Sequence, residues 1–140
     1  MDYEALKASI REDEGFRSSA YTDSRGFWTI GYGRLIDKRL GGGITRAEAE
    51  FLLNNDLQAC LSDLEERFHP WFSVLSDARQ RALVELRFQL GMTKFLGFQK
   101  MIRAFENAHY KEAASELLDS HLAQECPERT QRLAALIRAG

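Results

Sequence analysis

The 140-residue sequence has little of several features that mark specialised classes of protein. Its two cysteines, Cys60 and Cys126, are too few and too far apart for a disulfide framework, so we expect free thiols. Its three histidines show no metal-ligand spacing, and we expect neither a metal nor another cofactor. No uncharged apolar run approaches the length of a membrane span, which argues against membrane insertion.

The sequence also lacks an excess of charge of one sign. Lys and Arg number 19 against 21 Asp and Glu, which gives a net charge of −2. A dedicated nucleic-acid binder usually needs a basic surface, so the composition disfavours that class. Residues 1–7 have neither the basic nor the apolar region of a signal peptide, which predicts synthesis in a cytoplasm without export. We expect a monomer.

What is present is enough apolar surface for one folded domain. Hydrophobic residues make up 44% and aromatic residues 11% of the chain, which excludes disorder as the ground state. The length predicts a single domain over residues 1–140. The patterns predict a mainly helical α+β fold with a small lobe at about 15–45, a connecting helix at about 45–66, and a helical lobe at about 67–140 that includes an N-terminal helix at 2–14.

The small lobe and the connecting helix have clear local signals. Short aromatic and β-branched runs separated by glycine predict an antiparallel sheet within residues 16–43, with a hairpin connection at 24–26 and a loop at 41–43. Thr45 and Glu48 have the spacing of a capping box, so we expect the next helix to begin there. That helix would be about 30 Å long, enough to connect two lobes.

The sequence pattern predicts several shorter helices in the second half of the chain. Ser76 can cap a helix that ends at Gly91. Glu85 and Arg87 interrupt its apolar pattern, and we expect them to form ion pairs or to extend their charged ends to the surface. The remaining predicted helices cover residues 99–107, 110–118 and 127–138.

Glu14 has an unusual position for an acidic residue. It lies at the C-terminal end of the first predicted helix, where the helix dipole disfavours a negative charge. It also continues the apolar stripe of Leu6 and Ile10. The helix dipole and the desolvation expected beside apolar side chains both favour the protonated carboxyl that a general acid requires. The alternative is a solvated glutamate at a frayed helix end.

Asp23 and Thr29 follow within the predicted hairpin. Each has a simple structural explanation, because Asp commonly stabilises turns and Thr is common in strands. Together with Glu14, however, Asp23 supplies the second carboxylate that glycoside hydrolysis needs.

These residues lie within motifs that resemble a known family. Asp13-Glu14-Gly15, Tyr21-Thr22-Asp23 and the run Gly26 to Gly33 (GFWTIGYG) resemble the N-terminal signature of phage-type lysozymes, the T4 lysozyme-like endolysins of glycoside hydrolase family 24. The resemblance continues through residues 43–50, 55–56, 88–91 and 120–129, and so covers nearly the whole chain.

The resemblance implies a fold and a chemistry. The fold would be the two-lobed lysozyme fold, and the activity would be hydrolysis of the β-1,4 bond between N-acetylmuramic acid and N-acetylglucosamine in bacterial peptidoglycan. Glu14 would be the general acid, while Asp23 and Thr29 would hold the attacking water, with inversion at the anomeric carbon. Arg129 would pair with the catalytic glutamate, and Leu35 and Phe88 would line the saccharide cleft. A phage enzyme would collect in the host cytoplasm and reach the cell wall at lysis.

The sequence departs from the family pattern at several positions. Arg34 replaces a frequent histidine, and we expect it to pair with Asp56. Leu122 replaces a usual tryptophan. Met101 and Glu116 stand where the family cleft has Ser and Asn, which leaves the outer saccharide contacts open.

Two other functions share the same residues. One is a catalytically silent module that binds peptidoglycan or chitooligosaccharide, although the intact set of Glu14, Asp23 and Thr29 disfavours it. The other is a lytic transglycosylase, which needs the acid but no residues to position water. The products distinguish them, because hydrolysis leaves a reducing sugar and transglycosylation leaves an anhydro sugar.

Overall fold

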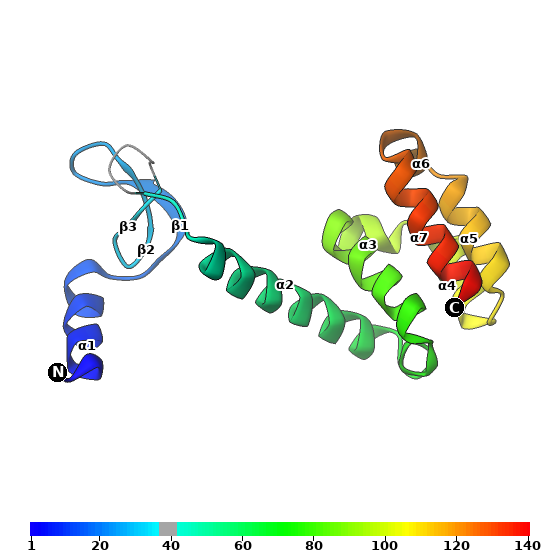
Figure 1. Cartoon of the computed structure of the whole chain (residues 1–140), viewed down its shortest axis with the longest axis horizontal. Coiled ribbons are helices and arrows are strands. Elements are labelled where there is room, and N and C mark those ends of the chain that lie inside the picture. The colour runs from blue at the N-terminus through cyan, green and yellow to red at the C-terminus, as the bar shows by residue number, and fades with distance from the viewer. Residues whose placement is uncertain (37–41) are drawn as a thin grey trace. The chain divides into compact units, whose positions relative to one another are not determined.

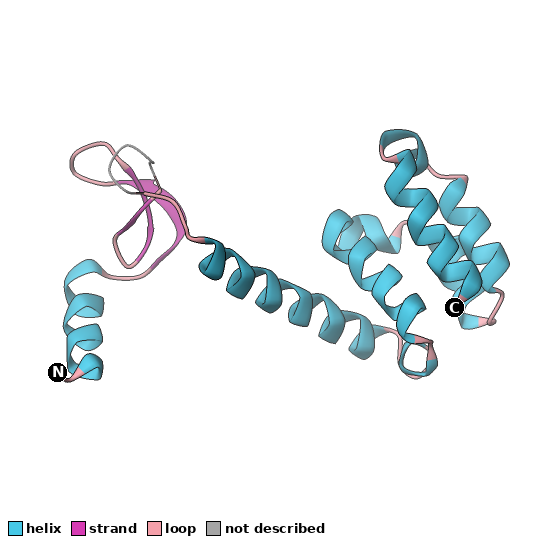
Figure 2. Ribbon diagram, in the orientation of Figure 1, coloured by secondary structure: helices cyan, strands magenta, loops and turns pink. Residues whose placement is uncertain are grey.

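The computed structural model describes residues 1–36 and 42–140. The chain forms two compact units, Met1–Phe51 and Leu52–Gly140. Most of it is helical, with a small antiparallel sheet in the first unit, as Figures 1 and 2 show. The predicted α+β, mainly helical class is confirmed. The first unit contains the N-terminal helix, and the assignment of that helix to the helical lobe stays a prediction.

The N-terminal helix α1, Tyr3–Glu14, has a cap at each end. The Asp2 side chain accepts hydrogen bonds from the N–H groups of Glu4 and Ala5, both at 3.0 Å. At the other end, Gly15 adopts φ 65° and donates its N–H to the Arg11 carbonyl at 3.1 Å. Glu14 is therefore the last residue of α1, as the sequence predicts.

Three short strands follow, magenta in Figure 2: β1 Arg17–Thr22, β2 Trp28–Gly31 and β3 Arg34–Leu35. They pair in the order β1-β2-β3, antiparallel throughout. The predicted connection at residues 24–26 lies between β1 and β2. Of the predicted glycine loop, Gly41 lies outside the described residues.

Helix α2, Arg46–Arg67, begins with the predicted capping box. The Thr45 N–H donates to Glu48 Oε2 at 2.7 Å, and the Glu48 N–H donates to Thr45 Oγ1 at 3.2 Å. Two orphan donors at the helix start are thereby satisfied, which explains why α2 begins at this point.

The second unit is a helical bundle around an apolar core. The 3₁₀ helix η2, Phe72–Val74, precedes α3, Asp77–Leu96, which Ser76 caps through its hydroxyl. The sequence predicts that this helix ends at Gly91, but the structure continues it to Leu96. Gly91, at φ 74° and ψ 162°, breaks the helical geometry inside that span. The other helices are α4 Gln99–Glu106, α5 Tyr110–Leu118, α6 His121–Glu125 and α7 Pro127–Ala139.

The core of this unit consists of buried apolar side chains from several helices. Pro127 occupies the first turn of α7, where its missing N–H costs nothing, and α7 packs against α3, α5 and α6. Figure 1 shows α7 lying between α5 and α3 in the bundle. The fully buried side chains include Leu64, Phe72, Leu83, Leu86, Phe95, Phe105, Leu117, Leu133 and Ile137.

Both cysteines are free, with Cys60 buried and Cys126 partly buried. Across residues 1–36 and 42–140, no helix has the length and apolar character needed to span a membrane. Within the same residues, no group of three or more His, Cys, Asp or Glu side chains is arranged to hold a metal ion.

Candidate active site

The sheet of the first unit brings two predicted site residues, Thr29 and Leu35, onto one face. Thr29 is opposite Tyr21 of β1 on one side and opposite Leu35 of β3 on the other. Residues directly opposite each other in an antiparallel sheet present their side chains on the same face, and alternate residues of a strand do so too. Tyr21, Thr29 and Leu35 therefore share one face of the sheet. Asp23 follows β1 at the start of the turn and lies opposite Phe27, to whose carbonyl its N–H donates at 2.9 Å.

The carboxylate of Asp23 organises the β1–β2 turn. Its Oδ1 accepts the N–H groups of Arg25 and Phe27, both at 2.9 Å. Its own N–H donates to the Phe27 carbonyl at 2.9 Å. Asp23 thus has the structural role expected of an aspartate in a turn. Both of these backbone N–H groups donate to Oδ1 and neither donates to Oδ2.

The same contacts keep Asp23 ionised. The Phe27 N–H is the main cause of a lowered pKa, helped by the Arg25 N–H and by the guanidinium of Arg25. Partial desolvation opposes these contacts but does not overcome them. The other oxygen, Oδ2, lies 4.0 Å from Arg25 Nε. The turn therefore presents a negatively charged oxygen that can accept hydrogen bonds from a ligand or water.

Thr29 is a buried polar residue with a defined hydroxyl orientation. Only 2% of its surface is exposed, and its Oγ1 donates to the Phe27 carbonyl at 3.0 Å. A hydroxyl has one hydrogen, so this bond leaves Oγ1 with lone pairs to accept another hydrogen bond. Asp23 Oδ2 and Thr29 Oγ1 can thus both accept a hydrogen bond, and both residues are bonded to Phe27.

Glu14 is exposed at the end of α1 and lies against the turn between β2 and β3. Its carboxyl group is next to Gly33, so close that the Gly33 backbone forms one wall of its surroundings. Gly33 belongs to the GFWTIGYG run, which by itself predicts no contact with Glu14. A close approach between residues 14 and 33 has no local signal in the sequence.

Arg34 has a different partner from the predicted one. Its Nη1 and Nη2 donate to Glu48 Oε1 and Oε2 at 2.8 and 3.0 Å, and its Nε donates to the Gly43 carbonyl at 2.9 Å. The predicted partner, Asp56, lies two helical turns beyond Glu48, about 12 Å along the axis of α2. The bidentate pair with Glu48 replaces the predicted pair and ties β3 to the start of α2.

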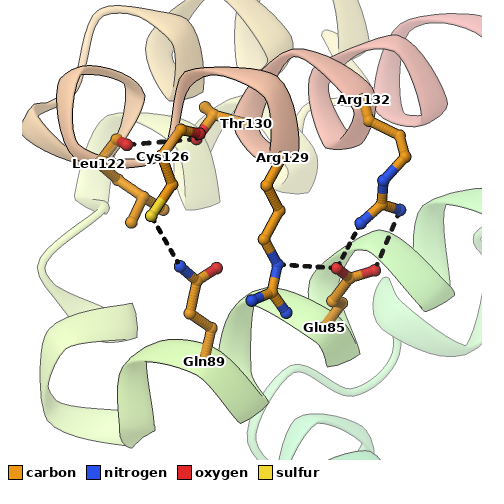
Figure 3. Close-up of polar contacts among 7 residues, drawn as sticks. All are labelled: Glu85, Gln89, Leu122, Cys126, Arg129, Thr130 and Arg132. Atoms are coloured by element: carbon orange, nitrogen blue, oxygen red, sulfur yellow. Dashed lines mark hydrogen bonds and ion pairs between the residues drawn. The ribbon is translucent and has the colours of Figure 1, made fainter.

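Arg129 belongs to a three-residue ion cluster in the second unit, shown in Figure 3. Its Nε donates to Glu85 Oε1 at 2.9 Å. Arg132 donates to both oxygens of the same carboxylate, at 2.5 and 3.2 Å. The bonds from Arg132, followed by those from Arg129, lower the pKa of Glu85 against the effect of burial. The prediction that Glu85 forms ion pairs is confirmed, and the cluster carries one excess positive charge.

The chain matches the model of the phage lysozyme family over residues 11–138. It belongs to that family. Lysozymes are glycoside hydrolases of peptidoglycan, and this is the reaction class of the chain.

Curated relatives agree with this membership. The phage lysozyme is 26% identical over 163 residues to probable T4-type lysozyme 1 of Dictyostelium discoideum, an alignment that covers 97% of this chain and 95% of the relative. It is 28% identical over 121 residues to an endolysin of Acyrthosiphon pisum secondary endosymbiont phage 1, covering 86% and 80%. It is also 28% identical to the pre-baseplate central spike protein Gp5 of Enterobacteria phage T4, covering 97% of this chain and 28% of the spike protein.

Phe88 of this phage lysozyme lies in a groove of the second unit. The groove has a volume of about 530 Å³ and combines apolar side chains with the Glu85 cluster. Phe88 is 42% exposed, so its ring is accessible from the groove. Its apolar neighbours there include Leu57, Val84 and Leu136.

The departures from the family pattern have structural consequences in the second unit. Leu122 is buried, and its carbonyl, like that of Cys126, lies within hydrogen-bond distance of Thr130 Oγ1, as Figure 3 shows. Gln89 Nε2 contacts Cys126 Sγ at 3.7 Å, while the buried Gln89 Oε1 has no hydrogen-bond partner among the described residues. Met101 is 1% exposed and is a core residue, whereas Glu116 is partly buried; both border a groove of about 710 Å³.

Proposed function

We propose that this phage lysozyme hydrolyses the β-1,4 bond between N-acetylmuramic acid and N-acetylglucosamine, with Glu14 as the general acid. In this mechanism Asp23 and Thr29 position the attacking water. The observation that carries the proposal is that Asp23 and Thr29, both hydrogen-bond acceptors, bond to the same residue: Asp23 Oδ1 accepts the Phe27 N–H at 2.9 Å, and Thr29 Oγ1 donates to the Phe27 carbonyl at 3.0 Å.

Two acceptors are suited to orienting a nucleophilic water. A water molecule can donate one O–H to Asp23 Oδ2 and the other to Thr29 Oγ1, which directs an oxygen lone pair away from both. As this lone pair attacks the anomeric carbon, the carboxylate of Asp23 accepts the proton that the water loses. The bond to the leaving sugar oxygen breaks, and Glu14 gives that oxygen its proton. Attack from the face opposite the leaving group inverts the anomeric centre.

Three further residues have supporting roles in the proposal. Leu35, opposite Thr29 in the sheet, and Phe88, exposed in its groove, would contact the saccharide. Arg129 would pair with Glu14 and stabilise the carboxylate that forms when the proton is transferred. We further propose a monomer that is held in the host cytoplasm and acts on the cell wall at lysis.

Glu14→Gln tests the central role, because it removes the transferable proton and nearly preserves shape. Glu12→Gln, an exposed acid of the same helix, is the matched control. We expect the Glu14 variant to lose a factor of about 10²–10⁴ in the rate of sacculus digestion, and the Glu12 variant to keep wild-type activity. Digestion by Glu14→Gln at a near wild-type rate would remove Glu14 from the mechanism.

The products decide between the related functions. Mass analysis of muropeptides from purified sacculi should find reducing muramic acid ends, since the paired acceptors Asp23 and Thr29 favour attack by water. Anhydro ends would indicate a transglycosylase instead. Sedimentation of the protein with sacculi, without release of any reducing ends, would indicate a binding module. The anomer formed first, followed by NMR on an oligosaccharide, tests inversion.

A further inference from the structure

Two glycines of the GFWTIGYG run, Gly31 and Gly33, are conformationally alike and flank Tyr32. Gly31 is the last residue of β2, and Gly33 lies in the turn of Tyr32 and Gly33 that leads into β3. Gly31 has φ 68° and Gly33 has φ 72°, a region that L-residues other than glycine rarely adopt. Backbone geometry alone therefore explains glycine at both positions.

The surroundings of the two glycines differ. A Cβ atom added to Gly31 would have no other atom within 4 Å. A Cβ atom added to Gly33 would lie 2.6 Å from Oε2 of Glu14, 2.8 Å from its Cδ and 3.3 Å from its Cγ. The carboxyl group of Glu14 thus occupies the volume that any side chain at position 33 would need.

We propose that Gly33 is a positioning residue for the Glu14 carboxyl, an inference that rests on the proposed role of Glu14 as general acid. Glu14 is exposed at the end of a helix, where its three side-chain torsions have few restraints. Contact with the bare backbone of the β2–β3 turn limits those torsions. The turn that leads into β3 therefore also holds the carboxyl of Glu14 against its backbone.

A side chain at position 33 would move the acid without unfolding the protein. The atoms that it meets first belong to the flexible end of Glu14, which can rotate aside. The backbone strain of a positive φ would be the same for a substitution at Gly31. A displacement of about 1 Å in a reacting group can lower the rate by about 10²-fold. Loss of activity at similar stability is thus the expected signature.

The test compares Gly33→Ala with Gly31→Ala. We expect similar decreases in Tm, and a decrease in kcat of about 10²-fold for Gly33→Ala alone, with KM on a soluble oligosaccharide changed by less than about threefold. Equal kcat values for the two variants would overturn the proposal. If either alanine variant fails to fold, Gly33→Asn and Gly31→Asn replace the pair, because asparagine tolerates positive φ better.

A spectroscopic readout separates this inference from the proposed function. In protein labelled with ¹³C at the glutamate carboxyls, Glu14→Gln identifies the Glu14 resonance. We expect that resonance to shift in Gly33→Ala and to stay in place in Gly31→Ala. No shift in Gly33→Ala would overturn the contact itself, whatever the activity. Full activity of Glu14→Gln would overturn the proposed function, and the positioning role with it, while leaving the contact intact.

Discussion

Asp23 holds the β1–β2 turn together and is also proposed to orient water, and Asp23→Asn separates these two tasks. Oδ1 accepts both backbone N–H groups, at 2.9 Å each, and an asparagine oxygen can accept the same two bonds. The amide nitrogen then takes the place of Oδ2, so the charge and the free acceptor are lost. Asp23→Ala, in contrast, removes the turn contacts as well.

The structure sets the size of each effect. Arg25 Nε lies 4.0 Å from Oδ2, and the Arg25 side chain is 67% exposed, so solvent screens most of that attraction. We therefore expect the Tm of Asp23→Asn at neutral pH to stay within about 2 °C of wild type. We expect its activity to fall by a factor of about 10²–10⁴, as for loss of a general base. Asp23→Ala should lose both activity and several degrees of Tm.

The lowered pKa of Asp23 adds a dependence on pH. The pKa of Asp23 in the folded protein lies below the ordinary value of 3.8. The ionised carboxylate therefore stabilises the fold fully above pH 3.8, and this stabilisation is lost as pH falls through the folded pKa. Asn cannot titrate, so between pH 4 and about pH 2 the Tm of Asp23→Asn should decrease less than that of wild type. The acidic limb of wild-type activity that is due to Asp23 should likewise lie below the ordinary carboxyl range.

Calorimetry across this range and the rate of sacculus digestion provide the measurements. Wild-type activity in Asp23→Asn would refute the role of the charge in orienting water. Parallel Tm curves for the two proteins would refute the reasoning about the turn, because they would show that the N–H groups of Arg25 and Phe27 do not favour the ionised form.

Two further variants test the second unit. Thr130→Val should lower the free energy of unfolding by no more than about 1 kcal/mol, because the Leu122 and Cys126 carbonyls also accept the backbone N–H groups of Cys126 and Thr130. Thr130→Ala, which also removes a buried methyl group, should lose about 1 kcal/mol more in urea titration. Phe88→Ala should raise KM for oligosaccharides about tenfold with little change in kcat, since its half-exposed ring is proposed to bind sugar. An unchanged KM would exclude Phe88 from the saccharide contacts.

Features that depend on neighbouring residues were predictable from the sequence. The glycine cap after Glu14, the capping box of Thr45 and Glu48, and helix α5 at Tyr110–Leu118 occur where the local signals place them. Each depends on a hydrogen bond or periodicity within a few residues. Helix α6 was missed because its five residues are too few to show a period.

Features that depend on tertiary approach were not predictable in the same way. Glu48 and Asp56 are both acids of α2, and only the path of the chain between β3 and α2 brings Glu48 to Arg34. At Gly91 the sequence signal was correct in that the helical geometry breaks there. Residues 92–96 nevertheless resume a helix, because the burial of Phe95 in the core stabilises the helical conformation there.

Gly31 and Gly33 show why a sequence motif does not indicate every role of its residues. Positive φ at Gly31 and at Gly33 satisfies the same local requirement, so no pattern of neighbouring residues distinguishes them. What distinguishes them is Glu14, which comes from a helix that ends 19 residues before Gly33 and fills the space beside only one of them. In the sequence, Gly31, which only the backbone conformation requires, looks the same as Gly33, which is also proposed to position Glu14. The two differ in the atoms that surround them in the folded chain.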